Sequence, residues 1–480
     1  MKPKDFIYLG IILLLGLILR LYNITAPLAD LHSWRQADTA AVSRNFVRSD
    51  FNLLMPKYDD LSSIQSGLEN PNGLRFVEFP IYNAIIAALY KIMPFIPIEI
   101  YGRIVSIFFS LVLISVIYYL VLKEKDRFTA IIASLIYSVF PFFVFFSRTV
   151  LPETTALSFS YIAILFLYLN LNIKDKKIEV FYIVLSSIAF SAGILIKPTV
   201  IFFFIPIIYL FFKKYGFSLY KKFNFYICLF ISIVPFILWR KYISNYPEAV
   251  PSSLWLISQV NTSQGLQNIF FRPAFFRWVF YERINNIIMG GFASFFLILG
   301  ILGKQKNNFF NSILFSSIVY LFVFQGGNVQ HEYYQILILP SLVIFSALGV
   351  NHIKKYSKQF IFPFFSILFI LMIFVFSFFI SLNTVKNYYN YSEDLVSISK
   401  IIKDLTQPND KIITDTTGDT TLLYLSDRKG SPAVYKDLGL FKNKGYSYFV
   451  TFNKELTKQI VRETDFNIIF ENDKFSIFKL

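Results

Sequence analysis

Residues 103–127 read RIVSIFFSLVLISVIYYLVLKEKDR, and they establish the class of the protein. The first 20 residues are almost wholly apolar, which is the length of a helix that crosses the hydrocarbon core of a bilayer. A basic cluster, Lys123–Arg127, follows directly. Because short loops rich in Lys and Arg stay in the cytoplasm, this stretch predicts a membrane span that begins at the external face and ends in the cytoplasm.

The whole chain repeats this pattern of apolar runs and basic clusters. Of its 480 residues 55% are hydrophobic and 58 are Phe, and the mean hydropathy is +0.55. Such a composition excludes a soluble protein. The net charge of +16 comes mostly from short clusters between apolar runs, so topology explains it and no nucleic-acid partner is expected. The single cysteine, Cys228, excludes an intramolecular disulfide and a Cys-based metal site.

Five Lys-rich clusters fix the expected topology when they are placed in the cytoplasm together with the N-terminus. They comprise residues 123–127, 174–177, 213–222, 304–306 and 354–358. Eleven spans then follow, at about 6–24, 103–122, 128–147, 152–172, 180–196, 199–212, 223–241, 286–303, 309–325, 333–351 and 360–382.

One further apolar piece, residues 81–98, must not cross if every later cluster is to stay on the cytoplasmic side. It contains Asn83, Lys91, Pro94 and Pro97, which suits an interfacial helix on the outer surface. A twelfth span is the alternative.

From about residue 384 the composition becomes that of a soluble protein. Ser392 begins an amphipathic helix, and strand-like runs follow at 411–415, 446–452, 467–470 and 475–479. We therefore expect an all-α polytopic membrane protein with external interfacial helices and a small C-terminal α/β domain. The expected domains are a transmembrane catalytic domain at 1–383, with external loops 27–102 and 244–285, and an external domain at 384–480.

This topology places isolated charged side chains on one face of the membrane. A single Arg or Lys at a helix end can simply extend its charge to the membrane interface. Because so many charged residues are expected on the same face of the membrane, a functional cleft is the favoured explanation. The long external loop also carries Arg272, Arg277 and Arg283 among aromatic residues, a pattern in which Arg faces lipid phosphates. The other external residues are Asp30, Glu78, Arg103, Arg148, Glu153, Lys197 and the run His331-Glu332-Tyr333-Tyr334.

The first external loop holds the densest group of polar residues, LADLHSWRQADTAAVSRNF at 28–46. Ser33 followed by Gln36 has the form of a capping box, which predicts a helix over 34–48. Asp30 and His32 precede that helix, where a carboxylate and an imidazole form a plausible acid–base site and the helix amides favour an anion. The alternative is structural, with Asp30 capping a turn and His32 lying at the interface.

These motifs resemble the membrane glycosyltransferases of the GT-C class. The similarity is to the protein O-mannosyltransferase and aminoarabinose–lipid A transferase group, and in the first loop to a bacterial branch of it. It covers roughly residues 5–350. The motifs occur in the family's order: HSWRQADTAAVSRNF in the first loop, Glu78-Phe-Pro-Ile-Tyr, Arg103, Ser147-Arg148 with Pro152-Glu153, Ile196-Lys197-Pro198, and His331-Glu-Tyr-Tyr.

The resemblance implies a polyprenyl-phosphate sugar donor, an external active site and a base in the first loop. Relatives often carry adjacent Asp and Glu there, whereas this chain separates Asp30 and Asp38, so either could be the base. The catalytic candidates are thus Asp30, Glu153, His32 and Asp38. Glu78 stands where relatives carry Lys, so phosphate contact must come from other cations. The substrate-binding candidates are Arg35, Glu78, Arg103, Arg148, Lys197, Arg272, Arg277, His331, Tyr333 and Tyr334.

The chemistry of sugar transfer fits these residue types. A carboxylate can deprotonate the acceptor hydroxyl, and Arg, Lys or a divalent metal can neutralise the leaving phosphate. Asp30, Glu153 and His331 could hold such a metal, although the spacing does not demand one. The expected partners are a polyprenyl-phosphate-linked sugar, a lipid, glycan or protein acceptor, and the bilayer. The expected location is the cytoplasmic (inner) membrane, with the site and the C-terminal domain on the external, periplasmic side.

Two other functions compete with this reading. A polysaccharide polymerase or ligase also acts on lipid-linked glycans outside the membrane, but usually through a late loop that carries Arg and His. A lipid or glycan transporter should show charges near the centres of its spans and two related halves. Here the charges collect at one face and no repeat of halves is visible.

Overall fold

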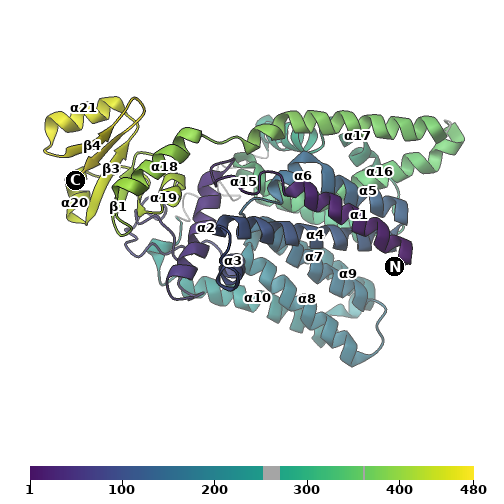
Figure 1. Ribbon diagram of the computed structural model, residues 1–480. Helices are drawn as coiled ribbons and strands as arrows, with labels where there is room; N and C mark the ends of the chain where they lie inside the picture. The colour runs from purple at the N-terminus through teal and green to yellow at the C-terminus, as the bar shows by residue number, and fades with distance from the viewer. Residues whose placement is uncertain (252–270, 361–362) are drawn as a thin grey trace. The chain divides into compact units, whose positions relative to one another are not determined.

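The structure is a computed structural model that describes residues 1–251, 271–360 and 363–480 (Figure 1). It divides into two compact units, which are described separately. The helical unit comprises Met1–Ile24, Arg103–Arg240 and the described residues of 253–389. The loop–sheet unit comprises Thr25–Gly102, the described residues of 241–252, and Asn390–Leu480. The first loop, Thr25–Gly102, groups with the C-terminal segment, Asn390–Leu480, and not with the apolar helices.

Helices of very different length form the helical unit (Figure 1). Two of them, α4 and α10, extend by a few residues into the part of the chain assigned to the loop–sheet unit. The elements are α1 (Pro3–Arg20), α4 (Ile98–Glu124), α5 (Arg127–Val139), α6 (Pro141–Phe146), α7 (Glu153–Asn170), α8 (Lys176–Ile196), η1 (Pro198–Phe203), α9 (Phe204–Tyr215), η2 (Gly216–Lys221), α10 (Phe223–Ile243), α12 (Pro273–Phe276), η6 (Arg277–Ile288), α13 (Ser294–Leu302), α14 (Phe309–Val323), α15 (Gln325–Gln330), η7 (Glu332–Ile338), α16 (Leu339–Phe360), α17 (Pro363–Val385) and η8 (Lys386–Tyr389).

Several of these segments match the dimensions of a bilayer. By length and composition, six stretches of the described chain could cross a membrane: Ile98–Glu124, Lys176–Ile196, Pro198–Lys221, Phe223–Ile243, Glu332–Ser357 and Pro363–Leu405. In contrast, the expected interfacial segment contains only the 12-residue helix α3 (Ile81–Ile92). At ~1.5 Å per residue α3 is too short to cross a hydrocarbon core of roughly 30 Å. Its length therefore favours the interfacial position over a twelfth span.

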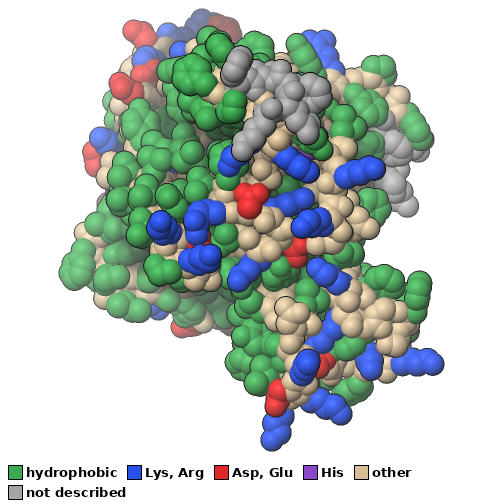
Figure 2. All heavy atoms as spheres, turned by 90° about the vertical axis from the view of Figure 1, so that its right-hand side faces the viewer, with side chains coloured by type: hydrophobic (Ala, Val, Ile, Leu, Met, Phe, Trp, Pro, Cys, Tyr) green, Lys and Arg blue, Asp and Glu red, His purple; other side chains and the backbone are tan. Residues whose placement is uncertain are grey.

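The Lys-rich clusters come together at one end of the helical unit. Arg127, at the start of α5, pairs with Asp5 of α1 at 2.5 Å, and Lys213 of α9 lies 3.6 Å from Glu124 of α4. Burial, together with the nearby Lys306 and other cations, lowers the pKa of Lys125. Figure 2 looks onto the end of the unit where the N-terminus lies and shows Lys and Arg side chains gathered there. Loops far apart in the sequence thus share one basic face.

Small residues let two helices of this unit approach closely. A Cβ added to Gly300 of α13 would stand 1.8 Å from the carbonyl oxygen of Phe345 in α16, and one added to Gly349 would stand 1.9 Å from that of Phe296. Because neither glycine has a side chain, the backbones of α13 and α16 can lie in direct contact, as at other membrane-helix interfaces that carry small residues.

The loop–sheet unit joins two distant parts of the sequence. Its helices are α2 (Ser33–Arg48), α3, η3 (Pro247–Ala249), α18 (Glu393–Leu405), α19 (Thr421–Leu425), α20 (Leu438–Asn443) and α21 (Lys454–Glu463), and its strands are β1 (Lys411–Thr414), β2 (Lys429–Ser431), β3 (Tyr446–Thr451), β4 (Asn467–Glu471) and β5 (Ser476–Lys479). The four expected strands are present within one or two residues. The sequence did not predict β2, because a three-residue Lys-Gly-Ser strand has no alternating pattern.

The sheet has the order β2-β1-β3-β5-β4, with β1 parallel to β2 and β3, and β5 antiparallel to β3 and β4. Alternate side chains of β1 enter opposite hydrophobic clusters, Ile412 beside α18 and α19, and Ile413 beside α20 and α21. The first loop extends the β2 edge, since Leu61 N donates to Gly430 O at 2.7 Å and Gly430 N donates to Asp59 O at 2.9 Å. The first loop and the C-terminal segment therefore form one folded body.

The contact between α13 and α16 gives a stability prediction. Gly300→Ala should force these helices apart and cost about 1–3 kcal/mol, which is usual for overpacking. The measurement is the fraction of full-length protein that stays monodisperse in detergent after heating. Gly10→Ala is the control, because a Cβ at Gly10 meets no heavy atom within 4 Å. Equal heat resistance of the two variants would show that α13 and α16 do not pack this tightly.

Candidate functional site

The first loop enters α2 through a turn that orients Asp30. His32 precedes the helix in the left-handed conformation, with φ of 57°, and Ser33 is the first helical residue. The predicted capping box is therefore wrong, because Gln36 does not reach back to the cap: its Nε2 donates to Asp30 Oδ1 at 2.6 Å and to Leu31 O at 3.0 Å. The predicted helix itself is confirmed. Asp30, which is 3% exposed, is thus held by a side chain one turn into α2.

Asp38, the other candidate base, lies in the middle of α2 in a tight network. Its carboxylate lies 2.9 Å from Arg75 Nη2 and accepts a hydrogen bond from Thr420 Oγ1 at 2.6 Å. Burial raises the pKa of the Asp38 carboxyl, and Arg75 and Thr420 act against that rise. Arg75 and Thr420 thus hold the Asp38 carboxylate in a fixed orientation. Neither Arg75 nor Thr420 could be recognised as a partner of Asp38 from the sequence, because both lie far from it along the chain.

Glu78 and Arg35 were both predicted to bind substrate, and the structure brings them together. Arg35 Nη2 of α2 forms an ion pair with Glu78 Oε1 just before α3, and both side chains are largely buried. The unusual Glu at position 78 therefore balances an arginine of α2.

Burial also singles out Asp60, which the sequence did not suggest. Burial raises the pKa of the Asp60 carboxyl to about 6. The backbone N–H of Ser62, which donates to this carboxyl at 2.8 Å, acts against that rise. A buried carboxyl that titrates near neutral pH is a feature of functional sites.

In the helical unit, the start of α7 and the end of α8 present a buried ion pair. Glu153 is the first residue of α7, and its Oε1 lies 2.6 Å from Nζ of Lys197, which follows α8. Glu153 is completely buried and Lys197 is 6% exposed. The Lys197 ammonium also lies 5.4 Å from the ring centre of Tyr334. The structure thus joins three of the predicted site residues, and the tilted rings of Tyr333 and Tyr334 lie 4.4 Å apart between their centres.

Two buried arginines reach the segment that leaves α1. Arg103 Nη1 of α4 donates to Ile24 O at 2.6 Å, and Arg148 Nη1 donates to Asn23 O at 3.1 Å. The Arg148 guanidinium also lies 4.6 Å from the ring centre of Tyr389. These contacts hold the segment that follows α1 against the helical unit.

The remaining candidates lie in the second long loop and the late motif. Arg272 is exposed, and Arg277 is also exposed and lies 3.6 Å from Glu282. The expectation that Arg283 faces lipid phosphates is wrong: this residue is buried, donates to Val329 O at 2.7 Å and lies 3.6 Å from Glu332. His331 stacks on Tyr333, with 5.3 Å between ring centres.

Of the three residues named as possible metal ligands, Glu153 and His331 belong to the helical unit and Asp30 to the loop–sheet unit. Within residues 1–251, 271–360 and 363–480, no three His, Cys, Asp or Glu side chains gather into a group that could hold a metal ion. Glu153 instead faces the ammonium of Lys197, which would repel a cation. No step of the reaction below is therefore assigned to a metal.

The Glu153–Lys197 pair gives a second prediction. Lys197→Met leaves a buried carboxylate without its cation and should cost about 3–5 kcal/mol of stability. Adding Glu153→Gln should restore most of it, because the unpaired charge is removed as well. The measurement is the thermal unfolding temperature in detergent, with Lys174→Met in an exposed loop as the control. A Lys197→Met protein as stable as the control would refute the pairing.

Comparison with known proteins gives one family match and several matches of fold. Residues 78–239 match the family model of the dolichyl-phosphate-mannose-protein mannosyltransferases. This segment contains Glu78, Arg103, Arg148, Glu153 and Lys197. By sequence alone, no curated protein matches the chain.

Solved structures similar to the chain include ArnT from Cupriavidus metallidurans bound to undecaprenyl phosphate. The TM-score is 0.68 at 12% identity, over 99% of this chain and 97% of ArnT. The oligosaccharyltransferase AglB from Archaeoglobus fulgidus, in complex with an inhibitory peptide and a dolichol-phosphate, gives 0.60 at 11% identity, over 94% of this chain and 69% of AglB. The Archaeoglobus fulgidus oligosaccharyltransferase in complex with Zn and sulfate gives a TM-score of 0.59 at 12% identity, over 92% of this chain and 67% of the oligosaccharyltransferase. The predicted resemblance to the GT-C glycosyltransferases is therefore confirmed: the chain has the fold of ArnT and contains a segment typical of the mannosyltransferase family.

Proposed function

We propose that the protein is a membrane glycosyltransferase that moves a sugar from a polyprenyl-phosphate donor to an acceptor hydroxyl at the external face of the cytoplasmic membrane. The observation that carries the proposal is the likeness to ArnT bound to undecaprenyl phosphate, which spans 99% of the chain. The mannosyltransferase match over residues 78–239 supports the same reaction class.

In this proposal Asp30 is the base. It accepts the proton of the acceptor hydroxyl as the oxygen attacks the anomeric carbon, and the bond from that carbon to the phosphate oxygen breaks. The hydrogen bond from Gln36 Nε2 orients the carboxylate. His32 and Asp38 take supporting roles, because His32 sets the turn into α2 and Asp38 pairs with Arg75.

The departing polyprenyl phosphate gains a negative charge, which cations must stabilise in the transition state. We assign this role to Lys197, Arg103 and Arg148, with the exposed Arg272 and Arg277 drawing the lipid phosphate from the headgroup region. Glu153 holds the Lys197 side chain in place through their ion pair. His331 and Tyr334, which are half-buried and both contact the buried ring of Tyr333, offer aromatic surface suited to the face of a sugar ring.

The proposed topology has eleven spans with the Lys-rich end in the cytoplasm. It is supported by the gathering of four basic segments at one end of the helical unit, through the contacts of Arg127, Lys213 and Lys125. The shortness of α3 supports an interfacial position for residues 81–98. The loop–sheet unit then lies on the external side.

The donor is tested with purified full-length protein in liposomes. We expect transfer of labelled sugar from a polyprenyl-phosphate donor to lipid, glycan or peptide fractions of the cell envelope. Asp30→Asn should lower turnover about 10²–10⁴-fold, the usual contribution of a general base. Asp50→Asn, at an exposed position soon after α2, is the matched control. Transfer from a nucleotide sugar without a lipid carrier would contradict the proposal, as would transfer of a preassembled glycan alone.

The topology is tested by labelling single cysteines in intact cells, in a Cys228→Ser background. An impermeant thiol reagent should label Asn443→Cys in the loop–sheet unit and leave Lys176→Cys unlabelled, because the membrane shields the basic end. Both positions are solvent-exposed, so permeabilised cells should label both. Labelling of Lys176→Cys from outside would refute the assigned sidedness.

A further inference from the structure

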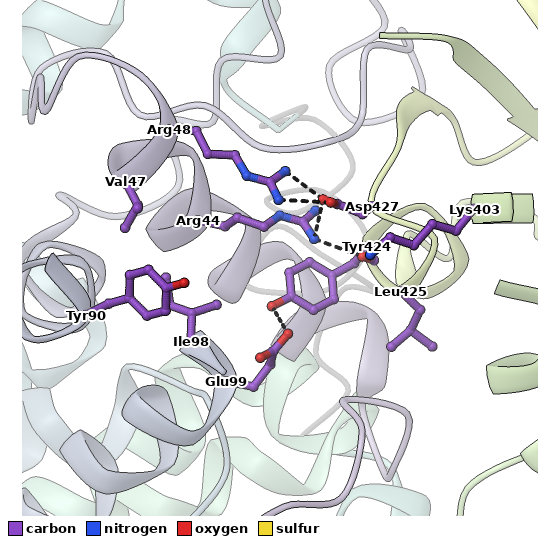
Figure 3. A pocket seen from close by; sticks show the side chains of 10 residues that line it. All are labelled: Arg44, Val47, Arg48, Tyr90, Ile98, Glu99, Lys403, Tyr424, Leu425 and Asp427. Carbon is purple, nitrogen blue, oxygen red and sulfur yellow. Dashed lines mark hydrogen bonds and ion pairs between the residues drawn. The ribbon is translucent and has the colours of Figure 1, made fainter. Parts of the chain in front are cut away.

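A pocket of about 270 Å³ lies within the loop–sheet unit, between α2, the end of α3, the first two residues of α4, and α18 with α19 (Figure 3). None of the residues that line it belongs to the candidate site described above. Its volume is in the range of a single sugar ring. The charged and polar lining residues are Arg44, Arg48, Tyr90, Glu99, Lys403, Tyr424 and Asp427.

One wall of the pocket already holds a carboxylate between two guanidinium groups. Arg48 contacts Asp427 with both terminal nitrogens, at 2.6 and 2.8 Å, and Arg44 Nη1 lies 3.0 Å from the same carboxylate. Arg44 also donates to Asp59 at 2.5 Å and to Tyr424 O at 2.9 Å. These bonds hold Arg44 rigidly, so the wall is organised before a ligand arrives.

Hydrogen-bond donors exceed acceptors around this space. In the described part of the chain, Nε of Arg44 is buried without an acceptor. Neither the Lys403 ammonium nor the Tyr90 hydroxyl has an ion pair or hydrogen bond to another described residue. Figure 3 shows the amine of Lys403 directed toward Tyr424 and Asp427, and the hydroxyl of Tyr90 directed toward the space beside Arg44.

The charge near the pocket is positive as well. Lys57 and Lys429 lie close to Arg44 and Arg48, and burial together with these neighbouring cations lowers the pKa of Lys429. Five cations thus lie near three carboxylates, those of Asp59, Glu99 and Asp427. An anionic ligand would relieve this excess.

Apolar and aromatic surface completes the lining. Val47, Ile98 and Leu425 contribute aliphatic groups, and the rings of Tyr90 and Tyr424 face the space from different elements. Tyr424 donates its hydroxyl to Glu99 Oε1 at 2.6 Å, which fixes the orientation of its ring. Rigid rings beside planar guanidinium groups suit a ligand that has a C–H face, several hydroxyls and a negative charge.

We propose that this pocket binds an anionic sugar, one that bears a phosphate or a carboxylate, as the recognition group of the acceptor. The proposal rests on the transferase function above and adds to it the chemical class of the acceptor. The negative group lies against Arg48 and Lys403, and the ring lies against Tyr90 and Leu425. Asp427 keeps both arginines aligned.

The test is isothermal titration calorimetry on the full-length protein in detergent, without donor, using glucose 1-phosphate and glucuronate as probes. Both should bind saturably. Glucose and orthophosphate should each bind about tenfold more weakly, because each provides only half of the recognised group. If orthophosphate binds with the same affinity as glucose 1-phosphate, the sugar part of the proposal is overturned. If glucose binds with that same affinity, the anionic part is overturned.

Two mild variants locate the binding. Lys403→Gln and Tyr90→Phe should each weaken glucose 1-phosphate binding several-fold, and both should fold normally because neither side chain has a hydrogen-bonded partner to lose. Lys400→Gln, three residues earlier in α18, exposed and outside the pocket, is the control. Equal binding in all three variants would overturn the proposal. Because no donor is present, a failure here is separate from a failure of the transferase assay.

Discussion

The structure of the helical unit depends on buried arginines that hydrogen-bond to backbone carbonyls where helices end or break. The last four carbonyls of a helix have no partner within it, and in an apolar bundle no water can serve them. Arg20 is completely buried and donates to the carbonyls of Gly16, Ser138 and Tyr137 and to the hydroxyl of Ser147. It thereby joins the end of α1 to the break between α5 and α6, and Arg103 and Arg148 do the same for the segment that leaves α1.

This constraint explains which parts of the site could be predicted from the sequence. Charges such as Arg103, Arg148, Glu153 and Lys197 stand out because each interrupts or borders an apolar run. Their partners do not stand out. A carbonyl becomes an acceptor only where a helix stops, and the break at Phe140–Pro141 lies inside what reads as one continuous span. Arg20 was missed for this reason, and Arg283 was placed at a lipid surface when it in fact serves the end of α15.

The loop–sheet unit shows the same division between local and long-range information. The helix at 393–405 follows from its capping residue Ser392, and four of the five strands follow from their local pattern. The helix at 33–48 is present although the capping box that predicted it does not form. The roles of Ser33, Gln36 and Asp38 depend on residues that the local sequence does not specify. Ser33 accepts a hydrogen bond from Thr421, and Asp38 accepts one from Thr420 across a separation of 382 positions. The three-residue strand β2 likewise exists because Asp59 and Leu61 of the first loop bond to Gly430.

The pairing of the first loop with the C-terminal segment has a consequence for biosynthesis. During synthesis α2 emerges among the first 50 residues, yet Thr420, Tyr424 and Asp427 are made only after every membrane helix has been produced. Until then Asp38 lacks one of its hydrogen bonds and Arg44 lacks its contacts with α19. Contacts this distant in sequence form slowly, since a long loop must close before they contribute any stability. We therefore expect the first loop to reach its final conformation only after the C-terminal segment has been synthesised. An early part of the chain thus depends on a late part for its folding.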